Sequence, residues 1–144
     1  MFKNVMMVCI GNICRSPIAE VYLKELHPDL NVYSSGLGAL VGKPADPKSV
    51  AIMAAKQINL DNHCAQQINS VLVSKADLIL TMEQRHVDAI QNKFPESRGK
   101  VHLIGKWNNN QEVPDPYKKD KAAFQLASSM IETGIESWSK KLWR

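Results

Sequence analysis

The sequence predicts an α/β protein: a three-layer αβα sandwich with a four-stranded parallel sheet and flanking helices. Short apolar runs alternate along the chain with segments of helical periodicity, which is the pattern of strand–helix–strand units. The runs are nearly continuous in apolar residues, as expected for parallel strands covered on both faces. The 144 residues have an ordinary globular composition and can bury a substantial core. We therefore expect residues 1–144 to form a single domain.

Each element of this fold has a local signal. The apolar runs predict four strands, over residues 3–9, 31–34, 77–82 and 101–104. Helical spacing of apolar residues predicts four helices, over residues 16–26, 46–57, 83–93 and 121–142. The first helix is expected to begin with Ser16 as its N-cap and Pro17 at the first helical position. Residues 37–46 and 105–119 are expected to be loops.

Charge and cysteine usage exclude several classes of protein. The net charge of +4 is mild, and no run of like charges resembles a nucleic-acid-binding arm, so we expect no nucleic-acid partner. No apolar stretch approaches the ~18–20 residues that span a bilayer, and the first residues lack the pattern of a signal peptide. An odd number of cysteines argues against a disulfide scaffold. We expect a cytoplasmic protein without stable membrane insertion.

The connection after the first strand has the composition of a phosphate-binding loop. Cys9 ends that strand, and parallel α/β sheets bind ligands at the carboxyl ends of their strands. Gly11 and Asn12 tolerate unusual backbone angles, and successive N–H groups in such a turn can form an anion nest. The following helix adds its positive end, and Arg15 adds a planar fork suited to two phosphoryl oxygens. The predicted loop consists of Cys9, Ile10, Gly11, Asn12, Ile13, Cys14, Arg15 and Ser16.

The positive electrostatic field of the loop amides, the helix N-terminus and Arg15 also favours a thiolate at Cys9, which indicates a nucleophile that attacks phosphorus. Ser16 could donate its hydroxyl to that thiolate, and Arg15 would hold the equatorial oxygens in the transition state. Other interpretations fit less well. The loop has neither a Walker A sequence nor Gly-x-Gly-x-x-Gly, and Cys9 and Cys14 are not spaced as Cys-x-x-Cys. A buried structural role explains Cys64 but explains Cys9 poorly.

Displacement of an alkoxide or phenoxide also needs a proton donor. The loop after the fourth strand contains Pro114-Asp115-Pro116-Tyr117, in which two prolines stiffen the backbone around one carboxylate. A simple turn is the alternative interpretation of this stretch. We expect Asp115 to protonate the leaving oxygen and then activate water, and Tyr117 to line the cleft.

Together these motifs resemble a known family. Residues 9–16 are similar to the Cys-x5-Arg-Ser loop of low-molecular-weight protein tyrosine phosphatases, and Asp115-Pro116-Tyr117 matches in position. The resemblance extends over essentially the whole chain. The stretches Ser35-Gly36-Leu37-Gly38-Ala39-Leu40-Val41-Gly42-Lys43 and Asp77-Leu78-Ile79-Leu80-Thr81-Met82-Glu83 resemble the bacterial branch that is associated with capsule or exopolysaccharide export.

The resemblance implies an enzyme that hydrolyses phosphotyrosine through a phosphocysteine intermediate, without a metal or other cofactor. It implies Cys9 as nucleophile, Arg15 as phosphate binder and Asp115 as general acid. Hydrogen-bond support under the loop is implied for Asn12, Ser16, Ser35 and His63. The implied substrate is a tyrosine-phosphorylated protein, a bacterial tyrosine autokinase with a tyrosine-rich C-terminal tail, whose dephosphorylation controls capsule or exopolysaccharide production. We expect the phosphatase to be a monomer.

Two further roles rest on the resemblance. Cys14 is implied as the redox partner that traps Cys9 in a reversible disulfide. Leu40 and Tyr117 are implied as walls of the substrate cleft; eukaryotic members carry an aromatic residue near Leu40 and a second tyrosine after Tyr117, so this cleft is less aromatic. Two alternatives remain open: an arsenate reductase on the same scaffold, which would need further redox cysteines, and a phosphate-binding or redox-sensing module without turnover.

Overall fold

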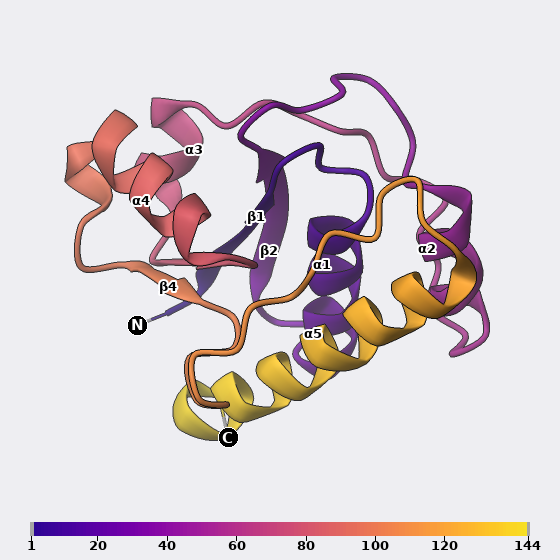
Figure 1. The fold of residues 1–144 in the computed structure, drawn as a ribbon. Coiled ribbons are helices and arrows are strands. Elements are labelled where there is room, and N and C mark those ends of the chain that lie inside the picture. The colour runs from indigo at the N-terminus through magenta and orange to yellow at the C-terminus, as the bar shows by residue number, and fades with distance from the viewer. Residues whose placement is uncertain (1, 144) are drawn as a thin grey trace.

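A computed structural model describes residues 2–143 of the chain. Its centre is a sheet of four parallel strands in the order β2-β1-β3-β4 (Figure 1). The strands are shorter or longer than expected by one or two residues: β1 spans Asn4–Cys9, β2 Asn31–Gly36, β3 Leu78–Thr81 and β4 Val101–Leu103. The parallel four-stranded sheet predicted from the sequence is therefore confirmed.

The strand order places a ligand site at the end of β1. The chain leaves β1 toward β2 on one side, and the later strands β3 and β4 are added on the other side. Connections on either side of β1 therefore diverge, which opens a crevice outside its carboxyl end. Cys9 is the last residue of β1 and pairs with Gly36 of β2. The predicted loop begins in that crevice.

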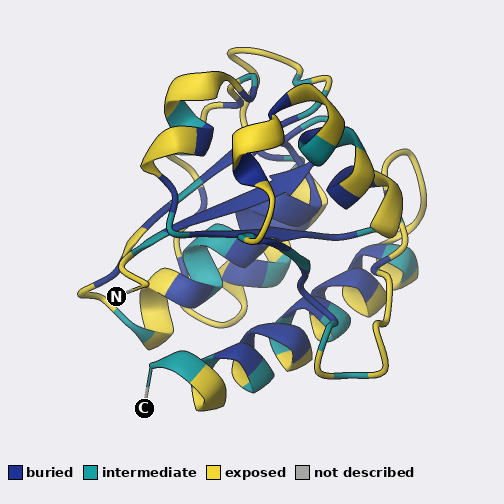
Figure 2. Ribbon diagram, turned by 90° about the vertical axis from the view of Figure 1, so that its left-hand side faces the viewer, coloured by how far each residue is buried: buried dark blue, intermediate teal, exposed yellow. Residues whose placement is uncertain are grey.

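Helices cover both faces of the sheet, which confirms the three layers. Alternate residues of β1 point to opposite faces: Met7 packs with Ile131 in one apolar cluster, and Met6 packs with Ile90 in the other. The first cluster lies under α1, α2 and α5, and the second under α3 and α4 (Figures 1 and 2). The helices are α1 Arg15–Leu26, α2 Pro47–Ala54, α3 Ser70–Lys75, α4 Gln84–Lys93, the 3-10 turn η1 Pro95–Ser97 and α5 Lys121–Leu142.

Three local expectations differ from the structure. Ser16 is not an N-cap: α1 starts at Arg15 after Cys14, and the Ser16 hydroxyl is engaged with Cys9 and Asn12 instead. The second helix ends at Ala54, three residues early, and the chain then turns through a left-handed conformation at Gln57 (φ 59°). The short helix α3 was not predicted. No helix in residues 2–143 is long and apolar enough to cross a membrane.

Candidate active site

The loop after β1 is held from outside by its carbonyl groups. All six carbonyl oxygens from Cys9 to Cys14 accept hydrogen bonds from surrounding segments. The pairs are Cys9 with Leu37 N (3.0 Å), Ile10 with Gly38 N (3.0 Å), Gly11 with Leu40 N (3.0 Å), Asn12 with His63 Nε2 (2.6 Å), Ile13 with Asp46 N (2.8 Å) and Cys14 with Ser49 Oγ (3.1 Å). Each carbonyl of the loop therefore faces the protein.

The amides of the loop consequently face the other way. In a trans peptide the C=O and the following N–H point in opposite directions, and the described chain has no cis peptide. Within the described residues, the N–H groups of Ile10 to Cys14 donate to no protein acceptor. Asn12 adopts φ 59°, the left-handed conformation that the sequence suggested. The inward amides form an anion nest around the end of β1.

Cys9 lies at the base of this nest with a hydroxyl beside it. Its side chain is 2% exposed, and its Sγ is 2.9 Å from Ser16 Oγ. Ser16 Oγ also accepts a hydrogen bond from Asn12 Nδ2 at 2.8 Å, so its own proton is free for the sulfur. The side chain of Ser16 therefore contacts the Cys9 sulfur, as expected from the sequence.

The support beneath the loop differs in one residue from the expectation. Asn12 Nδ2 donates to Ser34 Oγ at 3.0 Å, while the Ser35 hydroxyl donates to the sulfur of Met6 at 3.2 Å. Successive residues of a strand point to opposite faces, so only Ser34 of this pair faces the loop. The expectation that the Ser35 side chain supports the loop is therefore wrong, and the Ser34 side chain makes this contact instead. His63, in contrast, reaches the loop backbone through the carbonyl of Asn12.

Arg15 is buried and oriented by an acidic partner. Its side chain is 1% exposed, and its Nη1 donates to Glu83 Oε2 at 2.6 Å and to the Val113 carbonyl at 2.8 Å. Its Nε is buried without a protein partner, and its Nη2 lies 3.8 Å from Asp115 Oδ2. One edge of the guanidinium is thus occupied by the protein. The other edge is left for a bidentate contact with an anion.

Glu83 stays ionised in this arrangement. Burial by itself would raise the pKa of Glu83, but hydrogen bonds from Arg85 and Arg15 outweigh it and lower the pKa to about 2. The neighbouring His86 is buried with both ring nitrogens lacking hydrogen bonds, although Nε2 is 3.4 Å from Glu83 Oε2. Burial and the charge of Arg15 lower the pKa of His86 to about 4. The histidine is therefore neutral at pH 7, and Glu83 is the counter-ion of Arg15.

A cavity of about 160 Å³ connects Cys9, Arg15 and Asp115. Asp115 lies at its mouth, with Oδ1 accepting from the Tyr117 amide at 3.1 Å. Leu40 and Tyr117 are partly exposed at the rim, and Leu40 is tied to the loop through the carbonyl of Gly11. The lining residues are Cys9, Ile10, Gly11, Ile13, Cys14, Arg15, Gly38, Leu40, Asp115 and Tyr117. Among residues 2–143, no group of three or more His, Cys, Asp and Glu side chains is placed to hold a metal ion.

Comparison with known proteins agrees with this geometry. Residues 4–144 match the family model described as low molecular weight phosphotyrosine protein phosphatase. This chain belongs to that family. It is 49% identical over 142 residues to the low molecular weight protein-tyrosine-phosphatase Wzb of Escherichia coli K12, covering 99% of this chain and 97% of that protein. The resemblance inferred from the motifs is therefore confirmed.

Solved structures of the family superpose closely on the chain. Vibrio vulnificus Wzb in complex with benzylphosphonate has a TM-score of 0.95 and 40% identity, with 99% of this chain and 100% of that chain covered. A YwlE arginine phosphatase mutant with a phosphorylated active-site serine has a TM-score of 0.90 and 28% identity, with 96% and 95% covered. The fold predicted from the sequence is thus the fold of this phosphatase family.

The second cysteine of the phosphatase loop is in a different state from the first. Cys14 is buried, and its Sγ is 4.0 Å from Asp46 Oδ2. Burial, together with the charges of Asp46 and Cys9, raises the pKa of Cys14 to about 12. Cys14 is therefore a protonated thiol at neutral pH, which excludes it as the attacking nucleophile.

Several residues of this phosphatase site were not identified from the sequence. Glu83 directly follows the third predicted strand, at the same sheet edge as Cys9, so its position was a usable signal. Gly36 had no such signal: a Cβ there would collide with the carbonyl oxygen of Ile10, so the loop can lie against β2 only because residue 36 is glycine. Gln66, whose backbone N–H donates to Asn12 Oδ1 at 2.9 Å, was likewise not assigned to the loop.

Proposed function

We propose that this protein hydrolyses phosphotyrosine in proteins by nucleophilic attack of Cys9 on phosphorus. One observation carries the proposal: the unpaired loop amides and the free edge of Arg15 surround the sulfur of Cys9 in a cavity that Asp115 closes. These groups bind a dianion whose phosphorus lies next to the nucleophile. They also stabilise the charge that develops on the equatorial oxygens in the transition state.

In the first step the Cys9 thiolate forms a bond to phosphorus as the bond from phosphorus to the tyrosyl oxygen breaks. Asp115, in its protonated form, gives its proton to the leaving oxygen, which departs as a neutral phenol. The product is a phosphocysteine held by the loop amides and Arg15. The hydroxyl of Ser16 stabilises the thiolate before attack.

In the second step water attacks phosphorus, and the Asp115 carboxylate takes its proton. The bond between sulfur and phosphorus breaks, the thiolate of Cys9 is restored, and inorganic phosphate leaves. The phosphorylated active-site serine in the related YwlE mutant supports a covalent intermediate at this position.

The burial of Cys9 supports selection of an aryl phosphate. The sulfur lies at the bottom of a cavity whose rim is formed by Leu40 and Tyr117. A phosphotyrosyl group is long enough to place its phosphorus in the nest while the ring contacts the rim, whereas phosphoserine is shorter. Benzylphosphonate, the ligand named for the Vibrio structure, is an aryl-bearing phosphonate of this kind.

The proposed protein substrate is a tyrosine autokinase with a tyrosine-rich C-terminal tail, whose dephosphorylation would control capsule or exopolysaccharide production. The likeness to the protein named Wzb supports this branch of the family. We place the reaction in the cytoplasm and in a monomer. The free thiols of Cys9, Cys14 and Cys64 fit a reducing compartment.

The reaction is tested by hydrolysis of an aryl phosphate by the reduced protein without added metal. We expect Cys9→Ser to abolish turnover and Asp115→Asn to reduce kcat about a hundredfold to ten-thousandfold, the usual contribution of a general acid. Asp29→Asn, which removes an exposed carboxylate in the connection after α1, is the matched control. Phosphoserine and phosphoarginine serve as comparison substrates.

Rapid acid quenching followed by mass spectrometry of the intact protein should show one phosphoryl group on the wild type and none on Cys9→Ala, which has no nucleophilic side-chain atom at this position. An unphosphorylated wild type that still turns over would overturn the covalent mechanism. A preference for phosphoarginine over phosphotyrosine would overturn the substrate class. An inactive wild type would favour the alternative interpretation, a protein that binds phosphate or senses oxidants without turnover.

A further inference from the structure

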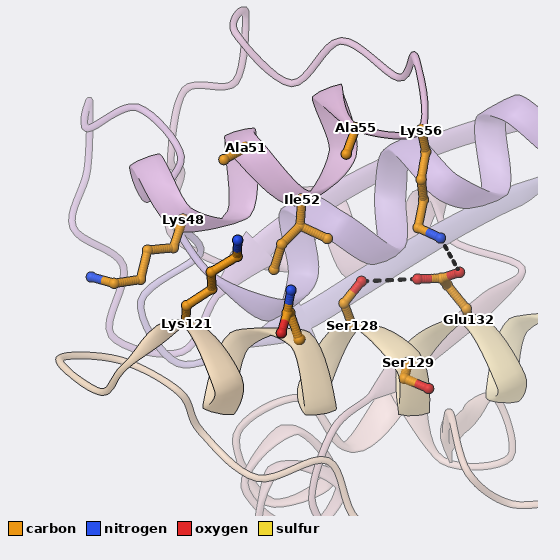
Figure 3. A pocket seen from close by; sticks show the side chains of 10 residues that line it. Lys48, Ala51, Ile52, Ala55, Lys56, Lys121, Ser128, Ser129 and Glu132 are labelled. Atoms are coloured by element: carbon orange, nitrogen blue, oxygen red, sulfur yellow. Dashed lines mark hydrogen bonds and ion pairs between the residues drawn. The ribbon is translucent and has the colours of Figure 1, made fainter.

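A second and larger cavity, of about 760 Å³, lies between α2 and α5 (Figure 3). Its floor is apolar: Ile52 points from α2 toward α5, between Ala51 of the same helix and Ala55 at the C-cap of that helix. The opposite wall is polar and is formed by α5. The wall residues are Gln125, Ser128, Ser129 and Glu132. This volume is within the range of specific binding sites, and the proposed mechanism does not use it.

The two ends of this α2–α5 groove differ in charge. At one end Lys56, in the turn after α2, reaches α5 and pairs with Glu132 at 3.1 Å, which neutralises both (Figure 3). At the other end Lys48 and Lys121 extend from the first turns of the two helices. Neither of these two lysines forms an ion pair with a carboxylate within residues 2–143. The groove thus combines an apolar floor with an end where two lysines form no ion pair, although the N-cap carboxylates Asp46 and Asp120 lie in the same turns.

The cationic end adjoins the phosphatase loop. The amide of Asp46, two residues before Lys48, donates to the loop carbonyl of Ile13. Lys121 is four residues beyond Tyr117 at the rim of the active-site cavity, and four residues span at most about 14 Å. A chain that enters the active site therefore reaches this end of the groove within a few residues.

The floor of the groove is also packed against the loop. Ile52 contacts the small apolar cluster that contains Ile13, Cys14 and Phe124. The Lys48 ammonium lies 5.5 Å from the centre of the Phe124 ring, which places Lys48 over the same cluster. The floor of the groove and the phosphatase loop therefore pack against the same apolar cluster.

We propose that the α2–α5 groove binds an acidic segment of the phosphotyrosine-bearing protein, so that the substrate is held at two places. Carboxylates of the segment would pair with Lys48 and Lys121, and its apolar side chains would lie on Ile52. An uncharged segment would desolvate both ammonium groups without compensation. The groove follows α2, which at eight residues is about 12 Å long. The distance from the rim of the active-site cavity to the groove is added to this length. An extended segment that lies about four to eight residues from the phosphotyrosine therefore matches the position of the groove.

This inference rests on the phosphotyrosine phosphatase activity, and synthetic phosphotyrosine peptides test it. One peptide carries glutamates about four to eight residues from the phosphotyrosine on its N-terminal side, and another carries them at the same distance on its C-terminal side. Each has a counterpart with glutamines. We expect one acidic peptide to show a kcat/KM about three- to tenfold higher than its counterpart at low salt, the range of two exposed ion pairs. High salt should reduce this advantage.

Two variants address the groove itself. Lys48→Gln combined with Lys121→Gln, and separately Ala51→Glu at an exposed position of α2, should each abolish the advantage of the acidic peptide. The matched control combines Lys75→Gln and Lys93→Gln, which remove the same charge on α3 and α4. All of these proteins should hydrolyse a small aryl phosphate at the wild-type rate.

The outcomes separate the two proposals. An acidic advantage that disappears in the groove variants and persists in the control supports docking. Equal hydrolysis of acidic and neutral peptides, or the same loss in the control variant, overturns it while leaving the phosphatase activity intact. Concentration-dependent dimerisation that Ala51→Glu abolishes would assign the groove to a second copy of the chain and also overturn it. Failure to hydrolyse the aryl phosphate would instead overturn the proposed function.

Discussion

The ion pair between Arg15 and Glu83 gives a prediction that links stability to activity. Glu83→Gln keeps the length of the side chain and removes its charge. The Arg15 guanidinium, 1% exposed, would then remain buried with only a neutral partner at Nη1. Loss of one partner from a buried pair typically costs about 3–5 kcal/mol. The pKa of Glu83, lowered from 4.5 to about 2, independently corresponds to about 3 kcal/mol of stabilisation.

The sign of this contribution sets its pH dependence. Because the pKa of Glu83 is lower in the folded protein than in the unfolded chain, the stabilisation is complete above about pH 4.5. It is lost as the pH falls toward 2, since protonation removes the negative partner of Arg15. In Glu83→Gln this component should be absent at every pH. The unfolding free energy at neutral pH should therefore drop by about 3 kcal/mol, and its decline between pH 4.5 and 2 should become shallower.

Chemical denaturation across this pH range measures the stability, and hydrolysis of an aryl phosphate measures the activity. Since Glu83 orients the guanidinium that we propose contacts phosphate, we expect kcat/KM to fall at least about tenfold, equivalent to 1.4 kcal/mol. Glu96→Gln, an exposed glutamate in η1, is the control. If Glu83→Gln loses no more stability than this control, or keeps the wild-type kcat/KM, then Glu83 does not hold Arg15 in place.

Three further predictions concern the loop and its support. Gly36→Ala should lower the unfolding free energy by about 1–3 kcal/mol and reduce kcat, because the new methyl group displaces the loop; thermal melting and aryl phosphate hydrolysis check this. Ser34→Ala should reduce kcat more than Ser35→Ala does, because only the Ser34 hydroxyl contacts the loop; equal effects would contradict that assignment. Cys14→Ser should remain active when reduced but recover less activity with dithiothreitol after peroxide treatment, since Cys9 then lacks its disulfide partner; full recovery would refute this role.

Sequence reasoning succeeded where local chemistry dominates. The apolar runs predict the strands, and the residue types between Cys9 and Ser16 predict the anion nest. The family motif placed Asp115 opposite Cys9 although 106 positions separate them. The cavity lining agrees with that placement.

The remaining features depend on long-range packing that local patterns do not encode. Whether Ser34 or Ser35 faces the loop is decided by the pairing of β2 with β1, and a shift of one residue reverses it. The role of Glu83 depends on β3 lying beside β1, and the sequence does not specify that strand order. Ser16 is a residue type typical of N-caps, but α1 already begins at Arg15 with Cys14 as its N-cap, so the Ser16 hydroxyl contacts Cys9 and Asn12 instead.

The six anchored carbonyls of the loop have a consequence for the energetics of substrate binding. Ordering the backbone of one residue costs about 1–2 kcal/mol. If the loop became ordered only when phosphate bound, most of this cost, added over the residues of the loop, would be subtracted from the binding free energy. Here the contacts that order it, from residues such as Leu37, His63 and Ser49, are made during folding. Binding energy from the substrate is therefore available for the transition state rather than for assembling the site.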